Sequence, residues 1–169
     1  MELNIIRGIL ITALITIFVT IFGFSNQDAE QSGGLSQKVT NFVVELIPRI
    51  KYMPEQEKEN IVNRIEKIIR KLAHFSIYTI VGILLMSLMS TYNFKELDKI
   101  AISLIIGIIY ASTDEIHQAF IPGRGPLITD VILDSIGVLT GIFIAMFIFS
   151  IIKYIQKKEH KVYKKHHRK

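Results

Sequence analysis

Four apolar stretches separated by polar segments organise the chain. They are residues 8–24, 72–94, 100–113 and 135–152, and none of them contains Lys, Arg, Asp or Glu; the last two supply only 14 and 18 residues and are bordered by acids. A helix rising about 1.5 Å per residue needs about 20 residues to cross a hydrocarbon core about 30 Å thick. The shorter stretches therefore cross a membrane only if the acids at their edges are included. We predict an all-α membrane protein with four transmembrane helices, at about residues 5–24, 72–92, 100–120 and 130–152.

The polar segment between the first two spans, residues 25–71, has a helical pattern of its own. Apolar residues recur at one-sided helical spacing over residues 39–50 and again over residues 61–72, with Pro48 and Pro54 between the two patterns. This predicts two amphipathic helices that lie on the outer leaflet or over the mouth of the bundle. The alternative is a small hairpin that packs only on itself. The second of these helices could continue directly into the second span.

Basic residues are concentrated in the C-terminal segment, residues 153–169, which holds eight Lys or Arg and one acid, Glu159. Because cytoplasmic segments next to a span carry an excess of Lys and Arg, we predict a basic cytoplasmic tail there. Both termini are then cytoplasmic, residues 1–152 form the four-helix domain, and the insert at residues 25–71 is extracytoplasmic. The rest of the chain has a slight excess of acids, so the net charge of +5 does not indicate nucleic-acid binding.

Two absences in the sequence narrow the possible chemistry and processing. No small-x-small cleavage site follows the first span, so we expect a retained anchor in place of a cleaved signal peptide. The chain contains no Cys, which excludes a disulfide, a thiolate nucleophile and a thiolate metal site.

Polar and charged side chains collect at one end of the predicted bundle. They lie at the start of span two, at the end of span three, in the turn that follows and at the start of span four, so the topology places them together at the outer face. An ionised side chain costs about 2.5–3.5 kcal/mol at the centre of a bilayer, and such a cluster therefore needs partners, water or a function. The predicted binding residues are Arg70, Lys71, His74, Tyr78, Asp114, Glu115, Gln118, Arg124, Asp130 and Asp134.

Helical spacing gives several of these residues a common direction. Arg70, His74 and Tyr78 are four residues apart on one stripe of span two, and Asp114 and Gln118 share a face of span three. A His at this position could exchange protons or pair with a carboxylate. The alternative is a set of interfacial anchors whose basic and Tyr side chains reach the headgroups.

Span four opens with two acids one turn apart, Asp130 and Asp134, and the same face continues through Gly137 and Gly141. Small residues four apart allow two membrane helices to approach closely. We therefore predict that these acids point into the bundle and not at lipid.

The turn between spans three and four contains Pro122 and Gly123, which suit the central positions of a type II turn. Arg124 follows between two glycines, so its guanidinium and the nearby backbone N–H groups could approach one anion together. The alternative is a salt bridge from Arg124 to Asp114 or Asp130.

We predict no metal site and no cofactor. A metal site built from His74, Asp114, Glu115 and His117 can be imagined, but the spacing of these residues matches no zinc or two-metal template, and the HExxH motif is absent.

The polar motifs taken together resemble the VanZ-like family of bacterial membrane proteins. The resemblance implies a small multi-pass protein of the bacterial cell membrane. The name-giving member of the family is associated with low-level resistance to teicoplanin-type glycopeptides, without altered peptidoglycan termini. The resemblance implies no established biochemical activity. It covers about residues 5–150 and is carried by Asp114-Glu115-x-x-Gln118-x-Phe120-x-Pro122-Gly123-Arg124, by Arg70-Lys71-Leu72-Ala73-His74-Phe75, by Asp130 and Gly137, and more weakly by Phe24-Ser25-Asn26-Gln27 with Ser32 and Ser36.

The chain departs from the family pattern at two positions. Ile77 stands where the family commonly has Glu, and Asp134 stands where it commonly has Asn. If the two positions face each other, the site keeps its charge with the carboxylate moved to another helix.

The resemblance and the polar cluster support two functional hypotheses. The first is a binding protein that modulates susceptibility to glycopeptide or lipoglycopeptide antibiotics by holding an amphiphile in an outer-leaflet pocket. The ligand would be a membrane lipid, a lipid-linked wall precursor or a lipoglycopeptide. The alternative is an enzyme acting on a lipid-linked phosphate or acyl group, with His74 and Asp114 as candidate catalytic residues. His74 would be the acid or base, an Asp would orient it and Arg124 would stabilise the developing anion. A third possibility is that the polar groups only hold the helices together.

Overall fold

Long helices account for nearly all of the computed structural model, which describes residues 2–26, 29–122, 125 and 127–166. No strand occurs in these residues. Four helices, α1, α4, α5 and α6, are long and apolar enough to cross a membrane. This confirms the predicted all-α membrane fold. In chain order the helices are α1 (Glu2–Ser25), α2 (Ala29–Glu45), α3 (Pro48–Lys51), α4 (Glu55–Ser90), α5 (Glu96–Gln118) and α6 (Ile128–His166).

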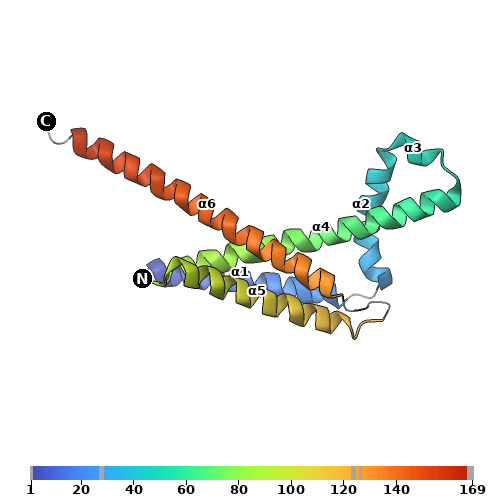
Figure 1. The fold of residues 1–169 in the computed structure, drawn as a ribbon, viewed down its shortest axis with the longest axis horizontal. Helices are drawn as coiled ribbons and strands as arrows, with labels where there is room; N and C mark the ends of the chain where they lie inside the picture. The colour runs from blue at the N-terminus through green and yellow to red at the C-terminus, as the bar shows by residue number, and fades with distance from the viewer. Residues whose placement is uncertain (1, 27–28, 123–124, 126, 167–169) are drawn as a thin grey trace.

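The central helix α4 combines the second amphipathic helix with the second span in one continuous element of 36 residues. At about 1.5 Å per residue it is about 54 Å long, so its N-terminal half extends well beyond a hydrocarbon core of about 30 Å. Helix α2 packs along this projecting half and α3 packs against α2, so that the two helices form a cover beside α4 (Figure 1). Pro48 stands at the first turn of α3 and Pro54 directly precedes α4, where a residue without an N–H is tolerated.

Helices α4 and α6 cross closely because glycines stand at their contact. A Cβ atom added at Gly82 would lie 2.1 Å from the carbonyl oxygen of Val138, and one added at Gly141 would lie 2.0 Å from the carbonyl oxygen of Thr79. A Cβ at Gly137 would lie 2.7 Å from the carbonyl oxygen of Phe75. The glycine face of span four therefore packs against α4, as the sequence predicts.

Helix α1 lies at the side of the bundle against α4 and α5. The Tyr110 hydroxyl of α5 donates to the carbonyl oxygen of Phe18 at 2.6 Å, and the two rings stack with their centroids 3.9 Å apart. Near the other end of α1, the Arg7 guanidinium donates to the Thr91 carbonyl oxygen at 2.6 Å. Most other side chains of α1 are exposed and apolar, which is typical of a lipid-facing helix.

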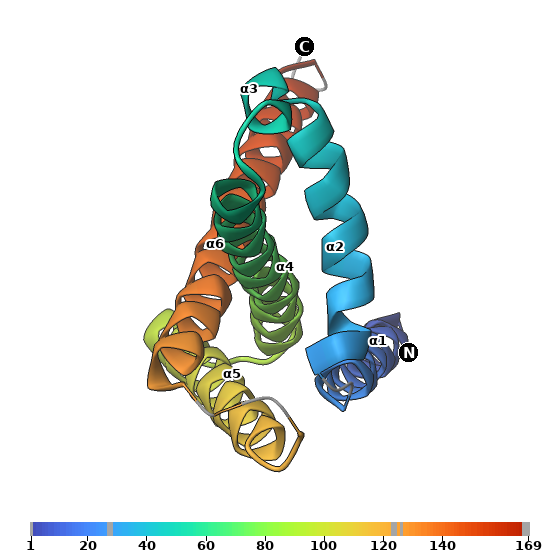
Figure 2. The same cartoon turned by 90° about the vertical axis from the view of Figure 1, so that its right-hand side faces the viewer.

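The two ends of the bundle differ. The start of α1, the α4–α5 connection and the basic last turns of α6 lie at one end, and α6 projects far beyond it (Figure 1). The end of α1, the start of α2, the end of α5 and the start of α6 lie at the other end, which we name the polar end (Figure 1). Viewed from that end, the projecting half of α4 runs between α2 and α6 (Figure 2). The predicted binding residues on α4, α5 and α6 all occur near the polar end.

Candidate functional site

A groove of about 360 Å³ opens between α4, α5 and α6 at the polar end. Its walls combine basic, acidic, amide and leucine side chains, so it offers partners for opposite charges beside apolar surface. We name it the polar groove. It is lined by Lys67, Arg70, Lys71, His74, Glu115, Gln118, Gly125, Leu127, Asp130, Leu133 and Asp134.

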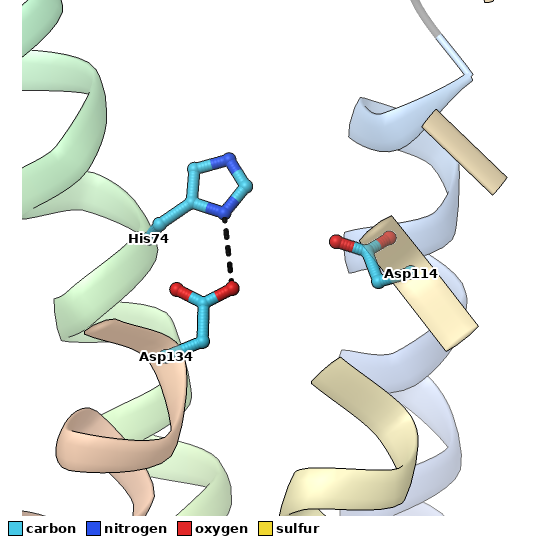
Figure 3. A group of neighbouring side chains, drawn as sticks. All are labelled: His74, Asp114 and Asp134. Atoms are coloured by element: carbon cyan, nitrogen blue, oxygen red, sulfur yellow. Dashed lines mark ion pairs between the residues drawn. The ribbon is translucent and has the colours of Figure 1, made fainter. Parts of the chain in front are cut away.

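Side chains from three different helices form a cluster that we name the floor of the polar groove. Of its members His74, Asp114 and Asp134, the first and the last line the groove, and Asp114 lies directly beside them. His74 of α4 and Asp134 of α6 form an ion pair in which Nδ1 and Oδ2 are 3.7 Å apart. Asp114 of α5 faces this pair, and one ligand atom from each of the three residues lies within 4.8 Å of the others (Figure 3). Asp114 and Asp134 are buried, at 5% and 2% exposure, whereas His74 is partly open to the groove.

Asp114 is held by two neutral donors. The Gln118 amide donates to its Oδ2 at 3.1 Å, and the Tyr78 hydroxyl donates to the same oxygen at 3.4 Å. The first bond confirms that Asp114 and Gln118 share a face of α5. Tyr78 is fully buried in the helix core, so it is not an interfacial anchor and instead positions this carboxylate.

Glu115 holds Leu127, the residue directly before α6. Its Oε1 accepts a hydrogen bond from the backbone N–H of Leu127 at 2.5 Å, and the side chain is buried. This bond fixes the position of Leu127, which lines the groove.

The rim of the groove carries an exposed ion pair between Lys71 and Asp130, with Nζ and Oδ1 2.7 Å apart. Both side chains are substantially open to solvent, so the pair contributes little to stability and can separate to meet a ligand. Asp130 is thus a rim residue, while Asp134, one turn further along α6, is a floor residue.

Arg70 lines the groove but its ion-pair partner is a residue that the sequence analysis did not single out. Its guanidinium pairs with Glu66 at 3.1 Å, and the Ser36 hydroxyl of α2 donates to the same Glu66 oxygen at 3.1 Å. Glu66 therefore ties the cover to the wall of the groove. The stripe of residues four apart on α4, continued one turn backwards from Arg70, would have found it.

Lys67 lines the groove and was not among the binding residues predicted from the sequence. It lies one turn before Lys71 on α4. Arg124 and Gly123 lie outside the described residues, so their predicted roles in the turn and in anion binding stay predictions. His117 is not part of the cluster of His74, Asp114 and Asp134. Its ring centroid is 4.5 Å from that of Phe22 on α1.

A second groove, in the described part of the chain, has a different character. It measures about 770 Å³ and runs along α1, lined by apolar residues, Gly8 and the three threonines Thr12, Thr16 and Thr20. Each threonine hydroxyl donates to the backbone of its own helix one turn earlier. Its lining has no titratable side chain, so this groove suits lipid chains and not acid–base catalysis.

Comparison with known proteins identifies one relationship. The family model described as VanZ/LLP1 matches residues 10–150, which is most of the chain and includes all ten predicted binding residues. No curated protein and no solved structure matches this chain.

Proposed function

The chain belongs to the VanZ/LLP1 family, and on that premise we propose that it modulates susceptibility to glycopeptide and lipoglycopeptide antibiotics by binding an amphiphilic cell-envelope ligand. The polar groove would receive the polar head of that ligand. The observation that carries the proposal is the mixed lining of the groove, with three basic side chains on α4 opposite acids on α5 and α6.

The groove has the size and charges for a headgroup. Its volume of about 360 Å³ lies in the range of about 300–1,000 Å³ typical of small-molecule sites. Lys67 and Lys71 supply ammonium groups for a phosphate or carboxylate, while Asp130 and Glu115 accept hydrogen bonds from hydroxyls and amines. A ligand with a phosphate and sugar or peptide groups would find partners for both.

An acyl chain would remain outside the groove, on the lipid-facing surface. Exposed apolar side chains occur on both neighbouring helices and just after α5. Ile116 on α5 and Phe120 in the turn after it are 60% and 80% exposed, and Ile128 and Ile132 on α6 are 81% and 54% exposed. The free energy of burying such residues favours contact with a hydrocarbon chain.

The proposal places the polar end at the outer leaflet, where wall precursors and glycopeptides occur. Support comes from the opposite end, where the excess of Lys and Arg in residues 153–169 favours the cytoplasm. Both chain ends would then be cytoplasmic, and the α2–α3 cover would be extracytoplasmic.

A second candidate function rests on the contact between His74 and Asp134. A half-open His paired with a buried carboxylate 3.7 Å away is an arrangement used for general acid–base chemistry. On this hypothesis the protein hydrolyses or transfers a lipid-linked phosphate or acyl group, and Arg124 stabilises the anion.

Retention of a lipid by the protein tests the binding proposal directly. Full-length protein is purified in a mild detergent and examined by native mass spectrometry, and the same variants are scored for teicoplanin susceptibility in a sensitive bacterial host. Lys71→Ala should lower both lipid retention and protection. Lys58→Ala, on the same helix but outside the groove, is the matched control. The proposal is wrong if no amphiphile is retained and both variants give wild-type susceptibility.

Conservative variants separate binding from catalysis. His74→Gln and Asp114→Asn should abolish an enzyme but weaken a binding protein gradually. If the groups only hold helices together, both variants should reduce expression or thermal stability and leave the lipid affinity of the folded fraction unchanged.

A further inference from the structure

We propose that His74, Asp114 and Asp134 form a binding site for one divalent transition-metal ion, such as Mn²⁺ or Zn²⁺, at the floor of the polar groove. The three residues come from α4, α5 and α6, and they offer one imidazole nitrogen and two carboxylates. Their ligand atoms lie within 4.8 Å of one another.

The spacing of the ligand atoms suits a shared ion. Ligands about 2.0–2.1 Å from a tetrahedral metal lie roughly 3.3 Å apart. His74 Nδ1 and Asp134 Oδ2 are 3.7 Å apart. Since the three ligand atoms lie within 4.8 Å of one another, side-chain movements that shorten these separations by up to about 1.5 Å would complete the set.

Unpartnered buried oxygens provide the second observation. Within the described residues, Oδ1 of Asp114 and Oδ1 of Asp134 are buried and have no hydrogen-bond partner. The carboxylate of Asp114 faces the His74–Asp134 pair (Figure 3). A buried acceptor without a partner costs about 1–3 kcal/mol and more when it is charged, so native proteins rarely leave two such atoms in one site.

The charge of the trio also calls for a cation. With His74 protonated, two carboxylates face one positive charge, and with His74 neutral they face none. Two of the basic side chains that line the groove have other acidic partners, since Lys71 pairs with Asp130 and Arg70 pairs with Glu66. In the described part of the chain, α5 and α6 bring no Lys or Arg into an ion pair with Asp114 or Asp134. A divalent ion would neutralise the site.

The donor set selects the class of metal. Imidazole suits Zn²⁺ and related transition metals, and carboxylates suit Mn²⁺, whereas Ca²⁺ and Mg²⁺ are bound mainly by oxygen ligands. Three protein ligands also leave a coordination position open. His74 and Asp134 line the groove, so the open coordination position faces the groove. Occupation of this position by a ligand phosphate rests on the proposed function.

The sequence could not suggest this site because no motif encodes it. The three ligands lie on separate helices, and the set that the sequence analysis considered and set aside contained Glu115 and His117 in place of Asp134. The proposal replaces the sequence-based expectation of no metal.

Metal binding to the full-length protein is the test, in the absence of any lipid or antibiotic, so that its result is independent of the proposed function. The chain carries a His-containing tail, so His160, His166 and His167 are replaced by Gln in every sample and no His tag is used. After treatment with a chelator, the protein is titrated separately with Zn²⁺, Mn²⁺, Mg²⁺ and Ca²⁺, and the bound metal is counted by elemental analysis after gel filtration.

One Zn²⁺ or Mn²⁺ per chain is expected, with Mg²⁺ and Ca²⁺ binding more weakly. Asp114→Asn and Asp134→Asn should each weaken binding by at least tenfold, and Asp98→Asn, which removes an exposed acid at the start of α5, should have no effect. Equal binding by all three variants, or no bound ion, overturns the proposal.

A spectroscopic measurement on the unaltered site covers the case in which a floor variant does not fold. With the tail histidines removed, only His74 and His117 remain. Pulsed electron paramagnetic resonance of bound Mn²⁺ should show coupling to one imidazole nitrogen, and a His117→Gln variant should retain it. Bound Mn²⁺ without nitrogen coupling, or with coupling that disappears in His117→Gln, would contradict the assignment.

Discussion

Replacing Gly141 with Ala should separate α4 from α6, because this glycine lies at their closest approach. The added Cβ would lie 2.0 Å from the carbonyl oxygen of Thr79 and 2.8 Å from the backbone nitrogen of Ile83. Both obstacles are backbone atoms of a helix, so no side-chain rotation relieves the contact. The two helices have to move apart by roughly 1 Å, a gap that forfeits about a quarter to a half of each dispersion contact across it.

The expected loss of stability follows from two opposing effects. Overpacking of a well-packed interface costs about 1–3 kcal/mol and sometimes more. Ala gains up to about 1 kcal/mol over Gly through helix propensity. The interface contains fully buried side chains, among them Tyr78, Val138 and Ile142, so we expect the upper part of the range and a net loss of about 2 kcal/mol.

Unfolding of the purified protein in mixed detergent micelles, followed by circular dichroism at 222 nm, measures this loss. The chain has no Trp and no Cys, so tryptophan fluorescence and thiol-reactive dyes are not available as probes. Gly8→Ala is the matched control, because a Cβ at Gly8 meets nothing within 4 Å. It should be neutral or slightly stabilising. Equal stability of Gly141→Ala and Gly8→Ala would refute the close α4–α6 crossing.

Three further outcomes follow from the site and its supports. Asp134→Asn should remove the carboxylate beside His74 and abolish protection in the susceptibility assay. Adding Ile77→Glu should restore protection, because it supplies a carboxylate one turn along α4. Simple additivity of the two changes would argue against a relocated charge. Lys71→Ala should lower lipid retention while changing the free energy of unfolding by less than about 1 kcal/mol, because its ion pair is exposed; a larger destabilisation in denaturant titrations would show a structural role. Tyr110→Phe should cost about 0.5–1.5 kcal/mol in the same unfolding assay, since it removes a 2.6 Å bond to the backbone of α1; an unchanged midpoint would mean that stacking alone holds α1.

The sequence predicts the helices of this fold well and their lateral arrangement poorly. Apolar length and periodicity report where a helix begins and ends, and which face is apolar, because these are properties of one segment. The clustering of polar residues at one end also follows, since alternating spans return the chain to the same side of the membrane. Even the direction of Asp134 could be inferred, because it shares a face with Gly137 and Gly141.

The partners of the polar residues depend on contacts between segments, which a single sequence does not encode. The pairing of His74 with Asp134, and of Lys71 with Asp130, requires the crossing position of α4 and α6 to within one helical turn. The sequence does not distinguish Glu66 from an ordinary charged residue on a solvated helix face. Its importance arises only when α2 folds back and Ser36 reaches it.

The length of α4 lets a single helix contact both the α2–α3 cover and the glycine crossing with α6. The hydroxyl of Ser36 on α2 donates to Glu66 of this helix, and the backbone of the same helix touches α6 between Phe75 and Gly82. His74 lies between these two contacts. The cover and the buried carboxylate beside His74 are therefore joined through one continuous helix and do not need to touch each other.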